Sequence, residues 1–148
     1  MTLRNVLTAI VLMVTVNSFA QIDVTTINTK EGIRYITPTV TFPITGTYLY
    51  NGAAPVVELN GDGTGYYQLH EQPKRAVLWG IECSETGEPL FIKGFDTAAY
   101  SLWYHYTVDP ALEMNEEWNR VPFSIHFSTL KMYIQGERVK DFTGTAEK

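Results

Sequence analysis

The sequence predicts an all-β, antiparallel fold, an up-and-down meander of about eight to ten strands. Short runs of tyrosine, valine, isoleucine and phenylalanine recur from Thr45 to Phe142. Clusters of turn residues such as Asn51-Gly52 separate these runs at intervals of about 8–12 residues, which is typical of strands joined by hairpins. The length of 148 residues fits one domain with its own core.

The first 20 residues have the features of a signal peptide. Arg4 supplies a positive start, an apolar run follows over 6–16, and Ser18 and Ala20 are the small residues that precede a cleavage site. The apolar run is much shorter than the roughly 20 residues that span a membrane. We expect an exported protein, periplasmic or secreted, cleaved after Ala20 and without a membrane span.

Residues 21–43 predict an extended lead-in, because they are rich in threonine and contain Pro38 and Pro43. Within them, Ile33 to Thr37 has the composition of one strand. Residues 44–148 are expected to form a single β-barrel domain. Closing the meander into a barrel would protect its edge strands, and a two-sheet sandwich is the alternative.

Alternation along the predicted strands places apolar side chains on one face of the sheet. With short hairpin turns, the predicted register pairs Tyr67 with Val57, Trp79 with Tyr67, Ile81 with Ile92, Cys83 with Leu90 and Ile92 with Leu102. The dry face then holds Val57, Leu59, Tyr67, Leu69, Val77, Trp79, Ile81, Cys83, Leu90, Ile92, Tyr100, Leu102 and Tyr104. The opposite face receives mostly polar residues, which predicts a continuous sheet with one dry side.

Two local features interrupt the meander. One short helix is predicted near 109–118, where Asp109 can cap, Pro110 fits the first helical position, and Ala-Leu-Glu-Met follows. Farther on, the apolar alternation changes phase between Phe127 and Leu130, which predicts a bulge or bend near Ser128-Thr129.

Three segments carry a family resemblance. Gly46-Thr47-Tyr48 opens a strand, Asp62-Gly63-Thr64 forms a hairpin turn, and Trp79 centres a later strand. Over about residues 45–107 the chain resembles the small exported lipocalin-like proteins of Bacteroidetes, although Tyr48 stands where that family usually has tryptophan. The resemblance implies a lipocalin-like β-barrel around a hydrophobic pocket, and it transfers no catalytic residue.

Composition excludes several classes of function. The net charge is −5 and the eleven basic residues are scattered, so no nucleic acid is expected as a partner. A single cysteine excludes an intramolecular disulfide and a multi-cysteine zinc site. We expect Cys83 to be an inert core residue. No phosphate loop, dinucleotide fingerprint or Gly-x-Ser-x-Gly motif is present, so no cofactor and no catalytic residues are predicted.

Two patterns resemble metal sites. Residues 60–71 overlap a calcium loop, with oxygen ligands at Asn60, Asp62 and Thr64. The flanking residues alternate as strands do, so a hairpin turn is the preferred interpretation. Three histidines, His70, His105 and His126, could bind zinc or copper if the fold gathered them, but none has a local partner. The glutamates at 113, 116 and 117 fit the solvated face of the short helix. We therefore predict no metal.

Aromatic residues are the remaining functional signal. Tyr67, Trp79, Tyr100 and Tyr104 lie on the dry face, either as core filling or as contacts for a small hydrophobic or aromatic ligand inside the barrel. The leading hypothesis is non-catalytic binding of such a ligand.

A second aromatic set defines the alternative function. Tyr66, Phe91 and Trp103 fall on the opposite face. They are either covered by the lead-in and the short helix, or they form an exposed patch of a structural or protein-interaction module.

Overall fold

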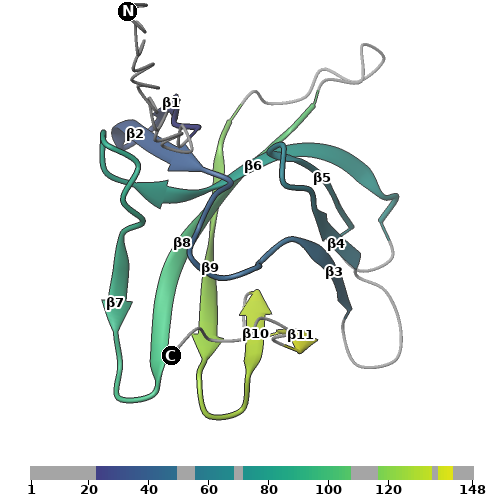
Figure 1. Ribbon diagram of the computed structural model, residues 1–148. Helices are drawn as coiled ribbons and strands as arrows, with labels where there is room; N and C mark the ends of the chain where they lie inside the picture. Colours follow the sequence, from purple (N-terminus) through teal and green to yellow (C-terminus); the bar gives the residue numbers. More distant parts are fainter. Residues whose placement is uncertain (1–22, 50–55, 69–71, 108–116, 135–136, 142–148) are drawn as a thin grey trace, which may run out of the picture.

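The computed structural model describes residues 23–49, 56–68, 72–107, 117–134 and 137–141 (Figure 1). Every regular element in these ranges is a β-strand. The strands are β1 (Thr25–Thr29), β2 (Gly32–Thr37), β3 (Gly46–Leu49), β4 (Val56–Leu59), β5 (Thr64–Tyr67), β6 (Arg75–Cys83), β7 (Phe91–Lys93), β8 (Thr97–Tyr106), β9 (Asn119–His126), β10 (Lys131–Ile134) and β11 (Glu137–Asp141).

Eight of the strands form a nearly closed antiparallel barrel. They follow the order β11-β10-β9-β8-β6-β5-β4-β3, and β11 lies beside β3 to bring the two ends of the sheet together (Figure 1). This confirms the predicted all-β barrel and its range of strand numbers. Most of the helix predicted over 109–118 lies outside the described residues, as do the predicted signal peptide and His70.

The hairpin of β4 and β5 has the predicted register, with Val57 opposite Tyr67. The predicted pairing of Tyr67 with Trp79 is wrong, because the connection from β5 to β6 is longer than a tight turn and Tyr67 faces Arg75. The error is an even number of positions, so the side chains still point to the predicted faces. Tyr67 and Trp79 are both buried as expected.

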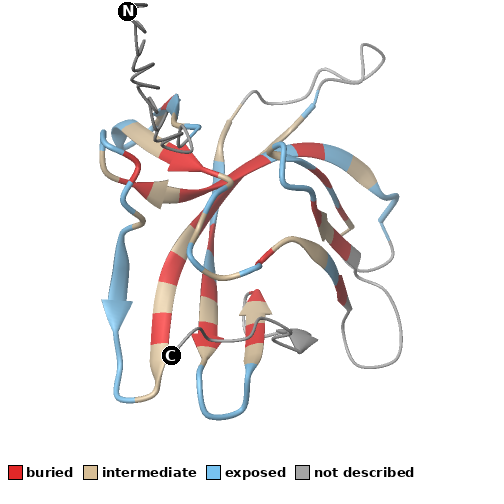
Figure 2. Cartoon of the chain, viewed as in Figure 1, coloured by how far each residue is buried: buried red, intermediate tan, exposed pale blue. Residues whose placement is uncertain are grey.

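Strand β7 does not lie between β6 and β8, which corrects the predicted meander. Instead β6 pairs directly with β8, with Ile81 opposite Leu102, and β7 pairs with the earlier half of β8, with Ile92 opposite Ala99. Cys83 faces Pro89 in an isolated bridge rather than Leu90. The predicted dry positions Leu90 and Ile92 are therefore 49% and 78% exposed. Figure 2 shows β7 as exposed along its length.

The lead-in forms a hairpin on the outer side of the barrel. The predicted strand over 33–37 is confirmed within β2, and β1 pairs with it. Strand β2 also pairs with the end of β6, opposite residues 81–83. Ile27 and Ile36 of the hairpin pack with Trp103 in a small second core, against which Trp118 is partly buried.

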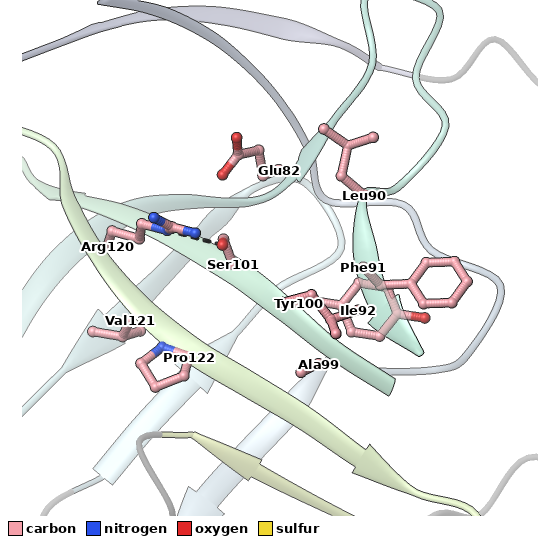
Figure 3. A pocket seen from close by; sticks show the side chains of 10 residues that line it. All are labelled: Glu82, Leu90, Phe91, Ile92, Ala99, Tyr100, Ser101, Arg120, Val121 and Pro122. Atoms are coloured by element: carbon pink, nitrogen blue, oxygen red, sulfur yellow. Dashed lines mark hydrogen bonds between the residues drawn. The ribbon is translucent and has the colours of Figure 1, made fainter. Parts of the chain in front are cut away.

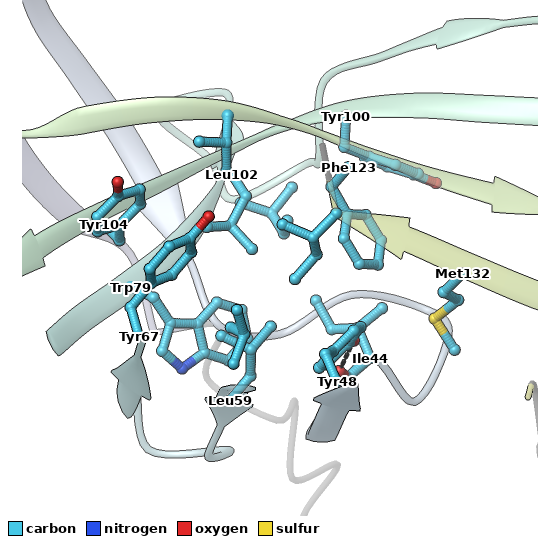
Figure 4. Packing of buried hydrophobic residues seen from close by; sticks show 14 of the residues in the cluster. Ile44, Tyr48, Leu59, Tyr67, Trp79, Tyr100, Leu102, Tyr104, Phe123 and Met132 are labelled. Carbon is cyan, nitrogen blue, oxygen red and sulfur yellow. Dashed lines mark hydrogen bonds between the residues drawn. The ribbon is translucent and has the colours of Figure 1, made fainter. Parts of the chain in front are cut away.

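The main core fills the barrel, and Figure 4 shows its packing. Its buried members come from every barrel strand from β3 to β10 and from the segment before β3: Ile44, Tyr48, Val57, Leu59, Tyr67, Val77, Trp79, Ile81, Ala98, Tyr100, Leu102, Tyr104, Val121, Phe123, Ile125, Met132 and Ile134. The Tyr48 hydroxyl donates to the Ile44 carbonyl, and burial raises the pKa of that hydroxyl. The bond ties the segment before β3 to the barrel.

The predicted change of phase after Phe127 is a hairpin turn over residues 127–130. Lys131 faces His126 across β9 and β10, and Leu130 has a positive φ of 50°. Facing residues of an antiparallel pair lie on the same side of the sheet, and here each odd-numbered residue of β9 faces an even-numbered residue of β10. The inward positions therefore change from odd numbers on β9 to even numbers on β10.

Candidate functional site

Three of the four predicted ligand contacts, Tyr67, Trp79 and Tyr104, lie close together inside the barrel, whereas Tyr100 lies farther along β8 beside Phe123 (Figure 4). Tyr67 and Tyr104 stack face to face, with ring centroids 4.5 Å apart and an interplanar angle of 4°. The Trp79 indole donates to the carbonyls of Asn60 at 3.1 Å and Thr64 at 2.9 Å. Trp79 is 2% exposed, and Tyr100 completes the set as a buried side chain. The four residues are thus part of the packed core, and a ligand-binding role for them stays a prediction.

The second predicted set does not form one patch. Tyr66 is exposed on β5, with the Lys74 ammonium 4.6 Å above its ring. Phe91 is exposed on β7, which lies on the other side of the view in Figure 1. Trp103 is only 3% exposed, because the β1–β2 hairpin covers it. The sequence left two alternatives for this face, coverage by the lead-in and the short helix or an exposed patch. For Trp103 the structure shows coverage by the lead-in.

An open groove lies over β7, β8 and β9 on the outer face of the barrel (Figure 3). We call it the β7 groove. Its volume is about 460 Å³, and its lining comprises Glu82, Leu90, Phe91, Ile92, Ala99, Tyr100, Ser101, Arg120, Val121 and Pro122. Tyr100 comes from the predicted ligand contacts and Phe91 from the predicted partner contacts. Their rings pack together with centroids 5.3 Å apart.

Strand alternation explains the shape of the groove. On β8 the large side chains of Tyr100 and Leu102 point into the barrel, so the outer face carries the small residues Ala99 and Ser101. These form a low floor between Ile92 on β7 and Pro122 on β9. The groove is open because β6 leaves β8 after Ile81 and β7 takes its place alongside β8.

Charged groups stand at one end of the groove. The Glu82 carboxylate accepts from the Trp103 indole at 2.9 Å and lies 3.5 Å from the Arg34 guanidinium. Arg120 uses its Nε to donate to the Ser101 hydroxyl at 2.9 Å (Figure 3). No carboxylate of the described residues forms a salt bridge with Arg120.

A second groove of about 560 Å³ lies between the β1–β2 turn and the start of β9. Arg120 lines both grooves. The Lys30 ammonium and the Glu117 carboxylate, both lining residues, lie 2.7 Å apart. The remaining lining is largely polar, and Trp103 and Trp118 are its aromatic members.

The loop resembling a calcium site forms a hairpin turn between β4 and β5. Asp62 accepts hydrogen bonds from the Thr64 hydroxyl at 2.6 Å and from the Thr64 backbone N–H at 2.9 Å. These bonds lower the pKa of the Asp62 carboxyl. Asn60 also donates to the Thr64 hydroxyl, at 3.1 Å. The predicted turn is therefore confirmed.

The two described histidines are far apart along β8 and β9. His105 faces Leu78 and packs on the Trp118 ring at 5.3 Å. His126 faces Thr97 at the opposite end of β8. At about 3.3 Å per residue, eight residues of strand separate the two positions by roughly 26 Å. In the part of the chain that the structure describes, no three histidine, cysteine or carboxylate side chains gather to hold a metal ion.

Cys83 is buried, as predicted. Burial, together with the nearby Glu82 charge, raises the pKa of its thiol to about 11. A thiol with so high a pKa holds its proton at neutral pH, and it is therefore a poor nucleophile.

Sequence reasoning missed Arg120 and Ser101 as site residues. Alternation along β9 could have found Arg120, because it precedes the inward residue Val121 and so faces outward.

Comparison with known protein-family models, with curated proteins and with solved structures gives no significant match. The described residues include no helix long and apolar enough to cross a membrane.

Proposed function

We propose that this chain is a lipocalin-like, non-catalytic binding protein for a small apolar or aromatic molecule, and that the β7 groove is its open site. The observation that carries the proposal is the exposed apolar lining of a groove of about 460 Å³. This volume falls in the range of small-molecule sites, which is about 300–1,000 Å³.

Burial of the exposed lining favours an apolar ligand. Leu90 and Ile92 expose 49% and 78% of their surfaces, and covering apolar surface contributes about 25 cal/mol per Å². The described lining contains no histidine, cysteine or lysine, and its carboxylate, Glu82, is already engaged. These features support binding without catalysis.

The interior of the barrel is the other place for the ligand. There the rings of Tyr67 and Tyr104 already stack on each other, so a ligand inserted between them would replace that contact. A ligand in the β7 groove needs no such change, and it still reaches Tyr100.

Titration with the uncharged fluorescent probe N-phenyl-1-naphthylamine tests the proposal. We expect saturable binding that Ile92→Glu weakens at least about fivefold, because a charge replaces an apolar wall. Ile33→Glu is the matched control, since Ile33 is 59% exposed and lies outside the lining of both grooves. Equal loss in both variants would contradict a specific groove. Amide shifts at Leu102 and Tyr104 with none at Ala99 would place the probe in the barrel.

We also propose that the protein is exported, to the periplasm or the medium, after cleavage behind Ala20. The support is the charged start, short apolar run and small residues of the first 20 positions. Mass spectrometry of the exported protein should find an N-terminus at Gln21. A protein that keeps Met1 would contradict the proposal.

Protein interaction is the second candidate function, and one observation favours it. In the described residues β7 pairs with β8 alone, so its other edge is open, and Phe91 and Phe95 are exposed beside it. An open apolar edge can accept an extended segment from another chain. If that chain is a second copy, sedimentation should show concentration-dependent dimers that Phe91→Lys abolishes. A monomer at every concentration tested would contradict this self-pairing.

A further inference from the structure

We infer that the ligand of the β7 groove is an amphiphilic anion, with its apolar body against β7 and its carboxylate or sulfonate on Arg120. This inference rests on the proposed function and adds the chemical class of the ligand. It depends on three observations: the orientation of Arg120, the neutralised state of Glu82, and the different linings of the two grooves.

The Arg120 guanidinium is held in place with its outer face free. Its Nε donates to the Ser101 hydroxyl at 2.9 Å, which anchors the group beside the floor of the groove. The two terminal nitrogens have no partner among the described residues. A planar guanidinium with free terminal N–H groups matches an oxyanion with two oxygens.

Glu82 is the carboxylate in the groove lining, and it does not neutralise Arg120. One of its oxygens accepts from Trp103 and the other lies 3.5 Å from Arg34. The carboxylate is thus paired from the side of the β1–β2 hairpin, where Arg34 lies between Glu82 and Glu31, and Arg120 forms no ion pair within the described residues. An anionic headgroup is favoured there, whereas a cationic one would meet no free carboxylate in the described lining.

The position of the apolar body follows from the difference between the grooves. Leu90, Ile92 and Pro122 present apolar surface on the Ser101 side of Arg120. The second groove offers mainly amide, hydroxyl and charged groups. An apolar chain or ring gains more binding free energy over β7 than in the second groove. In the second groove it would take water away from polar groups without replacing their hydrogen bonds.

Decanoate and decanol test the inference, because they share an apolar chain and differ in charge. Binding is followed through the amide signals of Ala99 and Ser101 and the Nε–H signal of Arg120. We expect decanoate to bind about fivefold tighter than decanol, as fits one charge-assisted contact near the surface. Arg120→Gln should remove the difference, and Arg120→Lys should restore part of it. Higher salt should weaken decanoate binding only.

Lys74→Gln is the matched control. It removes one positive charge from the chain, yet Lys74 pairs with Glu58 and lies outside both groove linings. Equal loss of decanoate binding in Lys74→Gln and Arg120→Gln would overturn the role of Arg120 and indicate an effect of net charge. Equal affinity for decanoate and decanol would overturn the anionic class while leaving the groove in place. If neither compound shifts Ala99 or Ser101, the proposed function itself fails.

Discussion

Substitution of Gly80 by alanine should loosen the β1–β2 hairpin from the barrel. Gly80 lies on the outer face of β6, opposite Trp103 of β8. An added Cβ would lie 2.8 Å from Cβ of Ile36 and 3.0 Å from its Cγ1 and Cδ1. Unstrained carbon atoms approach to about 3.5–4.0 Å, so Ile36 would have to retreat by roughly 0.7–1.2 Å.

The expected cost follows from two opposing effects. Overpacking of a well-packed contact costs about 1–3 kcal/mol. Against this, alanine in a strand loses less conformational entropy on folding than glycine, which offsets about 0.5–1 kcal/mol. From the middle of both ranges, we expect Gly80→Ala to lower the free energy of unfolding by about 1–2 kcal/mol. At roughly 4 °C per kcal/mol, the melting temperature should fall by about 4–8 °C.

Urea unfolding and thermal melting measure this change, and Gly61→Ala is the control. A Cβ at Gly61 would meet its nearest atom, Cγ2 of Thr45, at 3.9 Å, so that variant should keep its stability. Ile36→Ala removes Cγ1 and Cδ1, two of the three close atoms. It should therefore cost less in the Gly80→Ala background than in the parent protein. A Gly80→Ala variant as stable as the parent would refute the packing of Ile36 on Gly80.

Three further predictions concern single groups. Because burial raises the pKa of Cys83 from 9.0 to about 11, the folded protein should resist iodoacetamide at neutral pH, and its stability should fall as the pH rises from 9.0 towards 11. Rapid alkylation of the folded protein would contradict this. Bonds from Thr64 lower the pKa of Asp62, so their stabilisation should be present above its ordinary pKa of 3.8 and be lost as the pH falls below it. Asp62→Asn should flatten that acid dependence of the melting temperature. An unchanged profile would exclude a contribution of the Asp62–Thr64 bonds to it. Tyr48→Phe leaves the buried Ile44 carbonyl without its donor and should cost about 1–3 kcal/mol in urea unfolding; a loss below about 0.5 kcal/mol would contradict the bond.

The inward faces of the barrel could be predicted from alternation alone. Alternation places Tyr67 and Trp79 in the core despite the wrong pairing, because a register error of an even number of residues preserves the face. The turn at Asn60-Gly61-Asp62-Gly63 was predictable for a different reason. Its residues favour the turn through local hydrogen bonds and a positive φ at Gly63, independent of the rest of the chain.

The neighbours of each strand could not be predicted in the same way. Ile92 alternates as a core residue would, yet it is exposed because β7 pairs with the earlier half of β8 and places Ile92 opposite the outward-facing Ala99. Strand β1 was missed because Ile27 is its one apolar residue. Pairing between distant strands depends on the whole sheet, and a local pattern contains no information about it.

The β7 groove arises from how the outer face of β8 is covered. The hairpin of β1 and β2 covers Trp103 and stops before Ser101, which stays open as part of the groove floor. The same hairpin supplies Arg34, which pairs with Glu82, so Arg120 has no ion-pair partner among the described residues. Packing of the hairpin and selection of an anion are thus linked through one carboxylate. A substitution that displaces β2, such as Gly80→Ala, should therefore release Glu82 towards Arg120 and weaken decanoate binding more than decanol binding.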